Sequence, residues 1–260
     1  MTTTFEASLK DRNAGDYADF LLPHLHDDLC VLDVGCGTGT ITLGLAETVG
    51  HVFGVDLSDE EFVDARRYAA EHHIENVEFR VGSVYALDFP VDHFDACLCH
   101  SMLETLDRPL DGLIEIKRTL KPGAVLGVAC VEYGGLIVAG PNDELLNRFY
   151  AIRERVWQLE NAADPYCGRQ LRGLLARAGF DRVVATSKYF CYGTEAVVEA
   201  FGLARADECT DGWYGRSARK HGLATANDLD AMSRAWLVWS KSPDAYTAFA
   251  WCRALGWKPS

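Results

Sequence analysis

The chain has 260 residues, of which 48% are hydrophobic and 24% charged, an ordinary composition for a soluble globular protein with one sizeable core. Its formal net charge of -13 makes a nucleic-acid backbone or an anionic membrane surface an unfavourable partner. Composition therefore weighs against nucleic-acid binding and membrane association.

The nine cysteines form no CxxC pair, which favours reduced thiols over a disulfide framework. Residues 1–20 lack the basic start and apolar run of a signal peptide. No stretch approaches the roughly 18 apolar residues of a membrane span. We therefore expect a cytoplasmic protein.

The first half of the chain alternates strand and helix patterns. We expect strands over residues 30–35, 51–56, 77–82, 94–101 and 124–133, and helices over residues 16–25, 39–50, 58–73 and 110–120. Ser58 and Glu61 have the spacing of a capping box. Apolar strands separated by helices are typical of a parallel sheet covered on both faces.

The second half of the chain is richer in helix. We expect helices over residues 142–160 and 169–180, a strand over 181–192, mostly helix over 194–243 and a final strand over 246–257. This pattern predicts a single α/β domain over residues 1–260, with a doubly wound, mostly parallel seven-stranded sheet and one antiparallel strand near the C-terminus. Two helical insertions, residues 132–168 and 193–244, follow the carboxyl ends of strands, where ligands bind in such sheets. We expect them to form a helical cap over the site.

A glycine-rich loop follows the first strand in "VLDVGCGTGT" (31–40). Glycines there leave backbone N–H groups bare for a ligand. A dinucleotide fingerprint, GxGxxG, needs glycine where Thr40 stands, which disfavours an NAD-dependent oxidoreductase, and the GK[ST] of a P-loop is missing. A buried carboxylate at Asp33 is costly unless it is hydrogen-bonded or faces a cation. The loop therefore favours a ligand with amines and positive charge over a phosphate.

A second acid, Asp56, ends the second strand in "VFGVDLS". An acid at this place accepts both hydroxyls of a ribose and repels a 2′-phosphate. A nucleoside that carries an amino acid and a cation, and no phosphate, is S-adenosylmethionine. We therefore predict S-adenosyl-L-methionine as the cofactor.

The stretch from about residue 12 to 130 resembles class I S-adenosylmethionine-dependent methyltransferases, most of all the group typified by quinone-biosynthesis enzymes (methyltransferase type 11). The matching pieces come in order: "VLDVGCGTG", "VFGVDLS", "ARRYAAE", "NVEFRVGSVYALDF", "FDACLCHSMLETLDRP" and "EIKRTLKPGAVLGV". The resemblance implies a Rossmann-like transferase that binds S-adenosylmethionine.

The resemblance also implies where the cofactor lies. It places the three glycines under the methionine part, Asp56 at the ribose and Leu57 beside the adenine. The full set of expected cofactor-binding residues is Asp33, Gly35, Cys36, Gly37, Gly39, Asp56, Leu57, Ser83, Val84, His100, Ser101 and Tyr17. Many relatives carry Asp where this chain has Ser83, and serine is the weaker acceptor for the adenine amino group.

Candidates for chemistry come from the carboxyl ends of the fourth and fifth strands. His100 is expected to act as a base or a substrate anchor, with a histidine that only bonds the backbone as the alternative. Glu132 and Tyr133 are further catalytic or pocket candidates. Glu104 is expected to cap the next helix or to be exposed.

Cys97, Cys99 and His100 do not form a predicted metal site. On a strand the two cysteines face one side and the histidine the other. We therefore expect buried free cysteines and no metal.

Aromatic residues are frequent in the two insertions, and most should pack the cap. One or two that face inward would give a closed apolar pocket, suited to a small hydrophobic or aromatic acceptor. The aromatic residues concerned are Phe149, Tyr150, Trp157, Trp213, Tyr214, Trp236 and Trp239.

These observations predict methyl transfer to a small apolar or aromatic metabolite of specialised metabolism, at O, N or C, by SN2 displacement. One alternative is a homologue that binds the cofactor without methylating, as a rearrangement catalyst or a non-catalytic partner. Another is a macromolecule methyltransferase, which the acidic charge disfavours. The loop "HSML" also replaces the [DNS]PP[FY] that base-methylating enzymes often carry. Both a monomer and a homodimer are compatible with the sequence.

Overall fold

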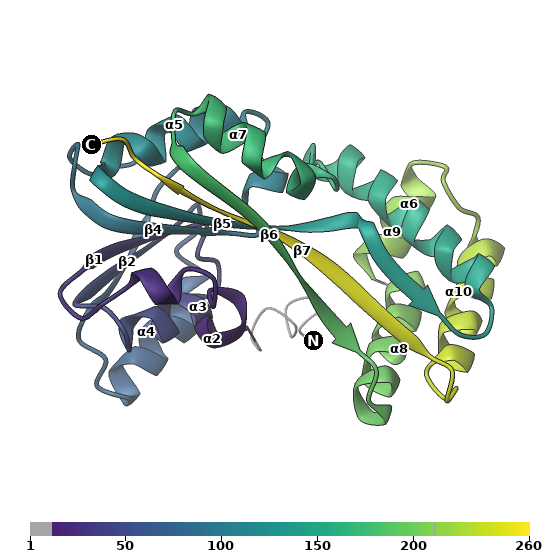
Figure 1. Ribbon diagram of the computed structural model, residues 1–260. Helices are drawn as coiled ribbons and strands as arrows, with labels where there is room; N and C mark the ends of the chain where they lie inside the picture. Colours follow the sequence, from purple (N-terminus) through teal and green to yellow (C-terminus); the bar gives the residue numbers. More distant parts are fainter. Residues whose placement is uncertain (1–11, 211) are drawn as a thin grey trace. The chain divides into compact units, whose positions relative to one another are not determined.

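The computed structural model describes residues 12–210 and 212–260. We expect no signal peptide in residues 1–20, and residues 1–11 of that stretch lie outside the described residues. The described residues form a seven-stranded sheet with the order β3-β2-β1-β4-β5-β7-β6, which confirms the predicted mostly parallel sheet with one antiparallel strand near the C-terminus (Figure 1). The strands are β1 (Cys30–Val34), β2 (His51–Asp56), β3 (Val77–Val81), β4 (Phe94–His100), β5 (Leu120–Ala139), β6 (Asp181–Tyr192) and β7 (Tyr246–Trp257).

Helices connect the strands. The α-helices are α2 (Ala14–Tyr17), α3 (Thr40–Ala46), α4 (Phe62–Glu71), α5 (Pro109–Thr119), α6 (Asp143–Asn161), α7 (Leu171–Arg177), α8 (Glu195–Thr210), α9 (Trp213–Lys220) and α10 (Ala226–Trp239). Short 3-10 helices are η1 (Leu22–His24), η2 (Leu103–Thr105) and η3 (Cys167–Gln170). Among the described residues, none of the helices has the length and apolar character needed to cross a membrane.

The chain divides into two compact units. Unit 1 comprises the chain up to Cys130, Cys167–Ser187 and Cys252–Ser260, and unit 2 comprises Val131–Tyr166 and Lys188–Trp251. Strands β5, β6 and β7 have residues in both units, and unit 2 also contains α6, α8, α9 and α10. Both predicted insertions overlap unit 2, and their role as a cap stays a prediction.

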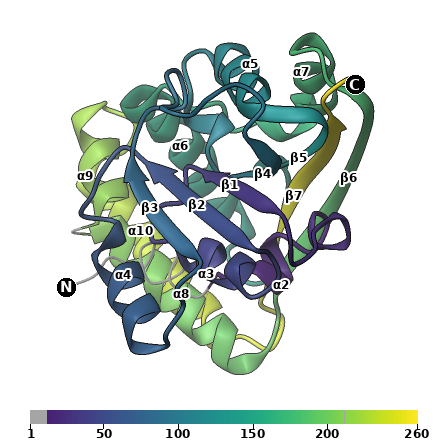
Figure 2. The same ribbon diagram turned by 90° about the vertical axis from the view of Figure 1, so that its left-hand side faces the viewer.

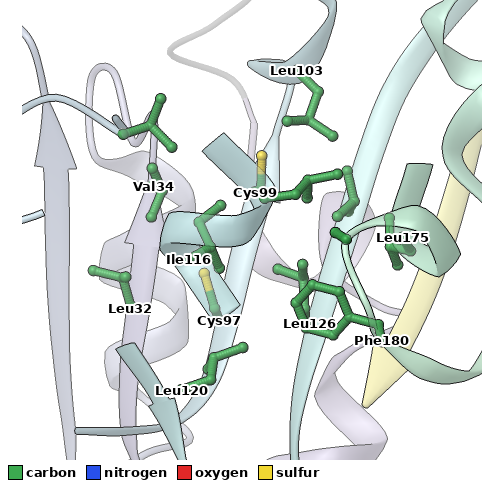
Figure 3. Packing of buried hydrophobic residues seen from close by; sticks show 14 of the residues in the cluster. Leu32, Val34, Cys97, Cys99, Leu103, Ile116, Leu120, Leu126, Leu175 and Phe180 are labelled. Atoms are coloured by element: carbon green, nitrogen blue, oxygen red, sulfur yellow. The ribbon is translucent and has the colours of Figure 1, made fainter. Parts of the chain in front are cut away.

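In unit 1, helices cover the parallel strands on both faces. β3, β2, β1 and β4 run side by side and in parallel (Figure 2). On one face, Leu32 and Cys97 pack with residues of α5 and α7, among them Ile116 and Leu175 (Figure 3). On the other face, residues of α2 and α3 pack against β1, β2 and β4. This double covering explains why the strands read as continuous apolar runs in the sequence.

Two predicted helices differ from the structure near their starts. The helix expected over 16–25 is divided into α2, which ends at Tyr17, and η1, which has Pro23 in its first turn. The capping box at Ser58 is wrong, since α4 begins at Phe62 with Glu61 as N-cap. The Ser58 hydroxyl instead accepts the Glu60 N–H at 3.2 Å, a local turn that competes with the helix start.

Two further boundaries differ. The helix expected over 169–180 forms as η3 followed by α7, and β5 continues to Ala139, beyond the expected end at residue 133. A Cβ on Gly135 would lie 2.6 Å from the Cβ of Ala250, so the glycine allows β5 and β7 to approach closely here. Gly134 and Gly135, which lie beyond the expected end of the strand, are thus part of β5.

Candidate functional site

The loop between β1 and α3 is built on three glycines with left-handed backbone. Gly35, Gly37 and Gly39 have φ of 75°, 50° and 74°, which other residues rarely adopt. A Cβ on Gly35 would lie 2.8 Å from the side chain of Met102, and one on Gly39 would lie 2.7 Å from that of Phe79. At Gly37 no heavy atom of the described residues, apart from its chain neighbours, lies within 4 Å of the Cβ position. Two of the glycines thus permit close packing, while the middle one borders open space.

Asp56, at the end of β2, connects to this loop. Its Oδ2 accepts the Gly37 N–H at 2.8 Å, and its Oδ1 accepts the Leu57 N–H at 2.7 Å. A carboxylate has about four acceptor sites, so two remain for a ligand. The Asp56 carboxylate therefore lies beside the glycine loop and retains about half of its capacity to accept hydrogen bonds.

A pocket of about 240 Å³ opens at this place in unit 1. Of the residues predicted to bind the cofactor, Gly35, Asp56, Leu57, Ser83, Val84 and Ser101 line it. The Leu57 side chain is 74% exposed, so it offers an apolar surface for a flat ring to cover. The remaining lining residues are Val34, Val55, Gly82, Tyr85, Met102, Thr105 and Leu106.

The lining residues do not include the other residues predicted to bind the cofactor: Asp33, Cys36, Gly37, Gly39, His100 and Tyr17. The Thr42 hydroxyl of α3 donates a hydrogen bond to Asp33 Oδ2 at 2.7 Å. Burial raises the pKa of Asp33 to about 7, partly opposed by this hydrogen bond. The protein itself therefore satisfies the Asp33 carboxyl, and its burial requires no cationic ligand. Burial also raises the pKa of the Cys36 thiol, which keeps it neutral.

His100 and Tyr17 contact each other in unit 1. Their rings meet edge to face with centroids 5.3 Å apart, and the Arg12 guanidinium lies 5.3 Å from the Tyr17 ring centroid. Burial, and then the charge of Arg12, hold the pKa of His100 well below its usual value, so the imidazole is neutral at physiological pH. The next residue, Ser101, turns the chain with φ of 57° and donates its N–H to the Ala129 carbonyl at 2.8 Å.

Glu104 was expected at a helix start or in solvent, and this is wrong. It is fully buried in η2, and α5 begins only at Pro109. Its charge contributes, after burial, to raising the pKa of the Cys99 and Cys130 thiols. Glu104 thus belongs to the interior of unit 1.

Cys97 and Cys99 both lie in the apolar core beside α5 (Figure 3). Burial raises the pKa of both thiols well above the usual value. The described residues contain no group of three or more His, Cys, Asp and Glu placed to hold a metal ion.

Glu132 and Tyr133 belong to unit 2. Glu132 is buried and accepts the Gly134 N–H at 3.0 Å. The Tyr133 ring lies 5.5 Å from that of Trp157. Their catalytic role stays a prediction.

Several lining residues were not singled out from the sequence. Met102, Thr105 and Leu106 follow Ser101, and Tyr85 follows Val84. The Tyr85 hydroxyl accepts the Arg108 N–H at 3.2 Å. All four lie within the segments that carry the family resemblance, so the resemblance indicates this region of the chain. The side-chain types alone did not identify these four residues as part of a site.

Known proteins are similar to this chain in sequence. Residues 31–123 match the model of a methyltransferase domain family. An uncharacterized methyltransferase of Schizosaccharomyces pombe is 30% identical over 68% of this chain and 66% of that protein. The demethylmenaquinone methyltransferase of Lactococcus lactis is 31% identical over 66% of this chain and 72% of that enzyme.

Solved structures share the fold. The YcgJ protein of Bacillus subtilis superposes with a TM-score of 0.64 at 17% identity, covering 95% of this chain and 99% of that chain. Phosphoethanolamine N-methyltransferase 2 of Haemonchus contortus, solved with S-adenosylhomocysteine, has a TM-score of 0.59 at 17% identity, over 95% of this chain and 53% of that chain. With the strand order and the glycine loop, these similarities place the protein: the chain belongs to the class I S-adenosylmethionine-dependent methyltransferases.

Proposed function

We propose that this protein is an enzyme that transfers the methyl group of S-adenosylmethionine to a small apolar or aromatic metabolite by SN2 displacement, in the cytoplasm. The observation that carries the proposal is the pocket of unit 1, where the glycine loop and the Asp56 carboxylate meet.

The residues of the pocket fit the cofactor. The open space at Gly37 leaves room for the amino-acid part of a ligand. The two remaining acceptor sites of Asp56 suit the two hydroxyls of a ribose. The exposed Leu57 side chain would cover one face of the adenine, and Ser83 and Val84 would border its edge.

The chemistry follows from what these residues do for a bound ligand. S-adenosylmethionine supplies an electrophilic methyl group on a sulfonium. The pocket residues hold and orient the ligand, and positioning is a large part of the rate of a displacement. The low pKa of His100 makes it a weak proton acceptor, so it suits the role of a neutral hydrogen-bonding anchor better than that of a base.

Three further assignments are part of the proposal. Residues 132–168 and 193–244 act as a cap that excludes water, and Glu132 and Tyr133 contact the acceptor. Tyr17, whose ring contacts His100, closes over the site. The net charge of -13 favours a small molecule over a nucleic acid as acceptor.

Calorimetric titration with S-adenosylmethionine and with S-adenosylhomocysteine tests the cofactor site. Both ligands should bind the wild-type chain and Asp59→Ala, an exposed acid nearby, and should fail to bind Asp56→Ala. Absence of binding to the folded wild-type chain would refute the proposal. The wild-type chain should then transfer the tritiated methyl group of labelled S-adenosylmethionine to members of a panel of small aromatic acceptors. Binding without transfer to any acceptor would favour the non-methylating alternative.

A further inference from the structure

Unit 2 buries two guanidinium groups around one carboxylate. Arg153 of α6 and Arg205 of α8 are each 9% exposed, as is Glu208 of α8. Arg153 Nη1 donates to Glu208 Oε2, and Arg205 Nη1 donates to the same oxygen at 2.8 Å. One acid thus faces two bases, and a buried charge without a counter-charge is costly.

The other buried acid of unit 2 does not restore the balance. Glu132 precedes Tyr133 on β5, and successive side chains of a strand point to opposite faces. Tyr133 is the residue that hydrogen-bonds to Arg153, and Glu132 accepts the Gly134 N–H instead. Among the described residues, the cluster of Arg153, Arg205 and Glu208, which we call the arginine cluster, therefore keeps a net positive charge.

Unmet hydrogen-bond donors lie in the arginine cluster and beside it. Within the described part of unit 2, three buried side-chain polar atoms have no hydrogen-bond partner: Tyr150 Oη, Arg205 Nε and Trp236 Nε1. All three can donate, and burial raises the pKa of Tyr150, which keeps its hydroxyl protonated. A group that only accepts hydrogen bonds and carries negative charge would meet both needs, and a carboxylate is such a group.

The three donors belong to one aromatic cluster. The Arg205 guanidinium lies 4.9 Å from the Phe201 ring centroid, and the Phe201 ring lies 6.0 Å from that of Trp236. The Tyr150 ring lies 5.9 Å from those of both Trp236 and Phe249. Aromatic walls strip water from a small inorganic anion but pack favourably on a flat apolar body. The surroundings therefore favour a carboxylate that is attached to an aromatic ring.

We propose that unit 2 binds the carboxylate of an aromatic acid through Arg205, Arg153 and the Tyr150 hydroxyl. This site goes beyond the proposed function and can be tested without it.

The test is calorimetric titration of the full chain with 2-naphthoate. Its neutral counterpart, 2-naphthalenemethanol, and inorganic phosphate are titrated in parallel. The variants are Arg205→Gln and Tyr150→Phe, with Arg219→Gln as matched control, because Arg219 is an exposed arginine of the same unit. Circular dichroism checks that each variant folds. If Arg205→Gln does not fold, Tyr150→Phe still tests the proposal, because it removes only the hydroxyl and retains the ring.

We expect one molecule of 2-naphthoate to bind wild type and Arg219→Gln equally. Affinity should fall at least about tenfold in each of the other variants, because a hydrogen bond to a charged group contributes that much. The neutral alcohol and phosphate should also bind at least about tenfold more weakly. Absence of 2-naphthoate binding, equal binding to all variants, or equally tight binding of the alcohol or of phosphate would overturn the proposal.

Titration of the same samples with S-adenosylhomocysteine separates this inference from the proposed function. Binding of S-adenosylhomocysteine without 2-naphthoate refutes the anion site alone. Binding of 2-naphthoate without S-adenosylhomocysteine supports the anion site and refutes the proposed function.

Discussion

The carboxylate of Asp56 accepts the N–H of Gly37, with 2.8 Å between oxygen and nitrogen. The contact joins the end of β2 to the glycine loop after β1, nineteen residues earlier in the chain. One side chain thus both orders the loop and lines the pocket, so we expect loop geometry and ligand binding to be coupled through Asp56.

Replacing Asp56 by asparagine should weaken binding of S-adenosylhomocysteine by about tenfold to a hundredfold, since a charged acceptor becomes a neutral one. The amide oxygen can still accept the Gly37 N–H, so the thermal midpoint should change little. Calorimetry and thermal unfolding measure the two effects, with Asp59→Asn as control. An unchanged affinity would contradict a ribose contact at this carboxylate.

Gly35→Ala and Gly37→Ala should differ in stability. Both place a side chain on left-handed backbone, which costs about 1–2 kcal/mol. Only the new Cβ at position 35 would meet Met102, at 2.8 Å, and overpacking adds about 1–3 kcal/mol. Urea unfolding should therefore show the larger loss for Gly35→Ala. Equal losses would mean that Met102 moves aside freely, and a larger loss for Gly37→Ala would contradict the prediction.

Asp33 should make the protein less stable as pH rises. Its pKa is about 7 in the folded chain and 3.8 in the reference state, so its contribution is full below pH 3.8 and is lost as pH rises through 7. Asp33→Asn should remove this pH dependence. The free energy of unfolding of Asp33→Asn minus that of wild type should therefore increase by up to about 4 kcal/mol from pH 4 to pH 8. Urea unfolding across this range measures the gain, with Asp59→Asn as the control that should track wild type. A constant difference between Asp33→Asn and wild type would refute the raised pKa.

His100 should change the stability with pH in the direction opposite to that of Asp33. Because the folded-state pKa of His100 lies well below 6.5, the unfolded chain binds a proton below pH 6.5 that the folded chain does not. Stability should fall as pH drops below 6.5, and His100→Gln should lessen that fall. Comparison of the NMR spectra of wild type and His100→Gln identifies the imidazole resonance of His100. In wild type the chemical shift of this resonance should not change between pH 6 and 9. A midpoint within that range would contradict a neutral buried imidazole.

The start of α10 should depend on Thr225. Its hydroxyl accepts the Asp228 N–H at 3.2 Å, and Asp228 accepts the Thr225 N–H at 2.9 Å. Thr225→Ala removes one half of this capping box and should cost about 1 kcal/mol in urea unfolding. Thr225→Ser retains the hydroxyl and should stay close to wild type. Equal losses in both variants would assign the effect to the methyl group.

The sequence by itself determined the order of the elements and the place of the glycine-rich loop. The bounds of β2, β6 and β7 agree with the predicted ranges, because apolar and β-branched runs are local signals that need no partner. Gly35, Asp56 and Ser83 could be assigned because strand ends, glycine spacing and motif order are also written locally along the chain.

Only the tertiary structure decided which side chains meet. Glu104 has the local setting of a helix start, and its burial depends on how η2 packs. Arg153 and Glu208 are 55 residues apart, and no periodicity relates two helices that distant. Asp33 has an internal partner because α3 brings Thr42 to it. Contacts of this kind depend on long-range packing, which composition and spacing do not encode.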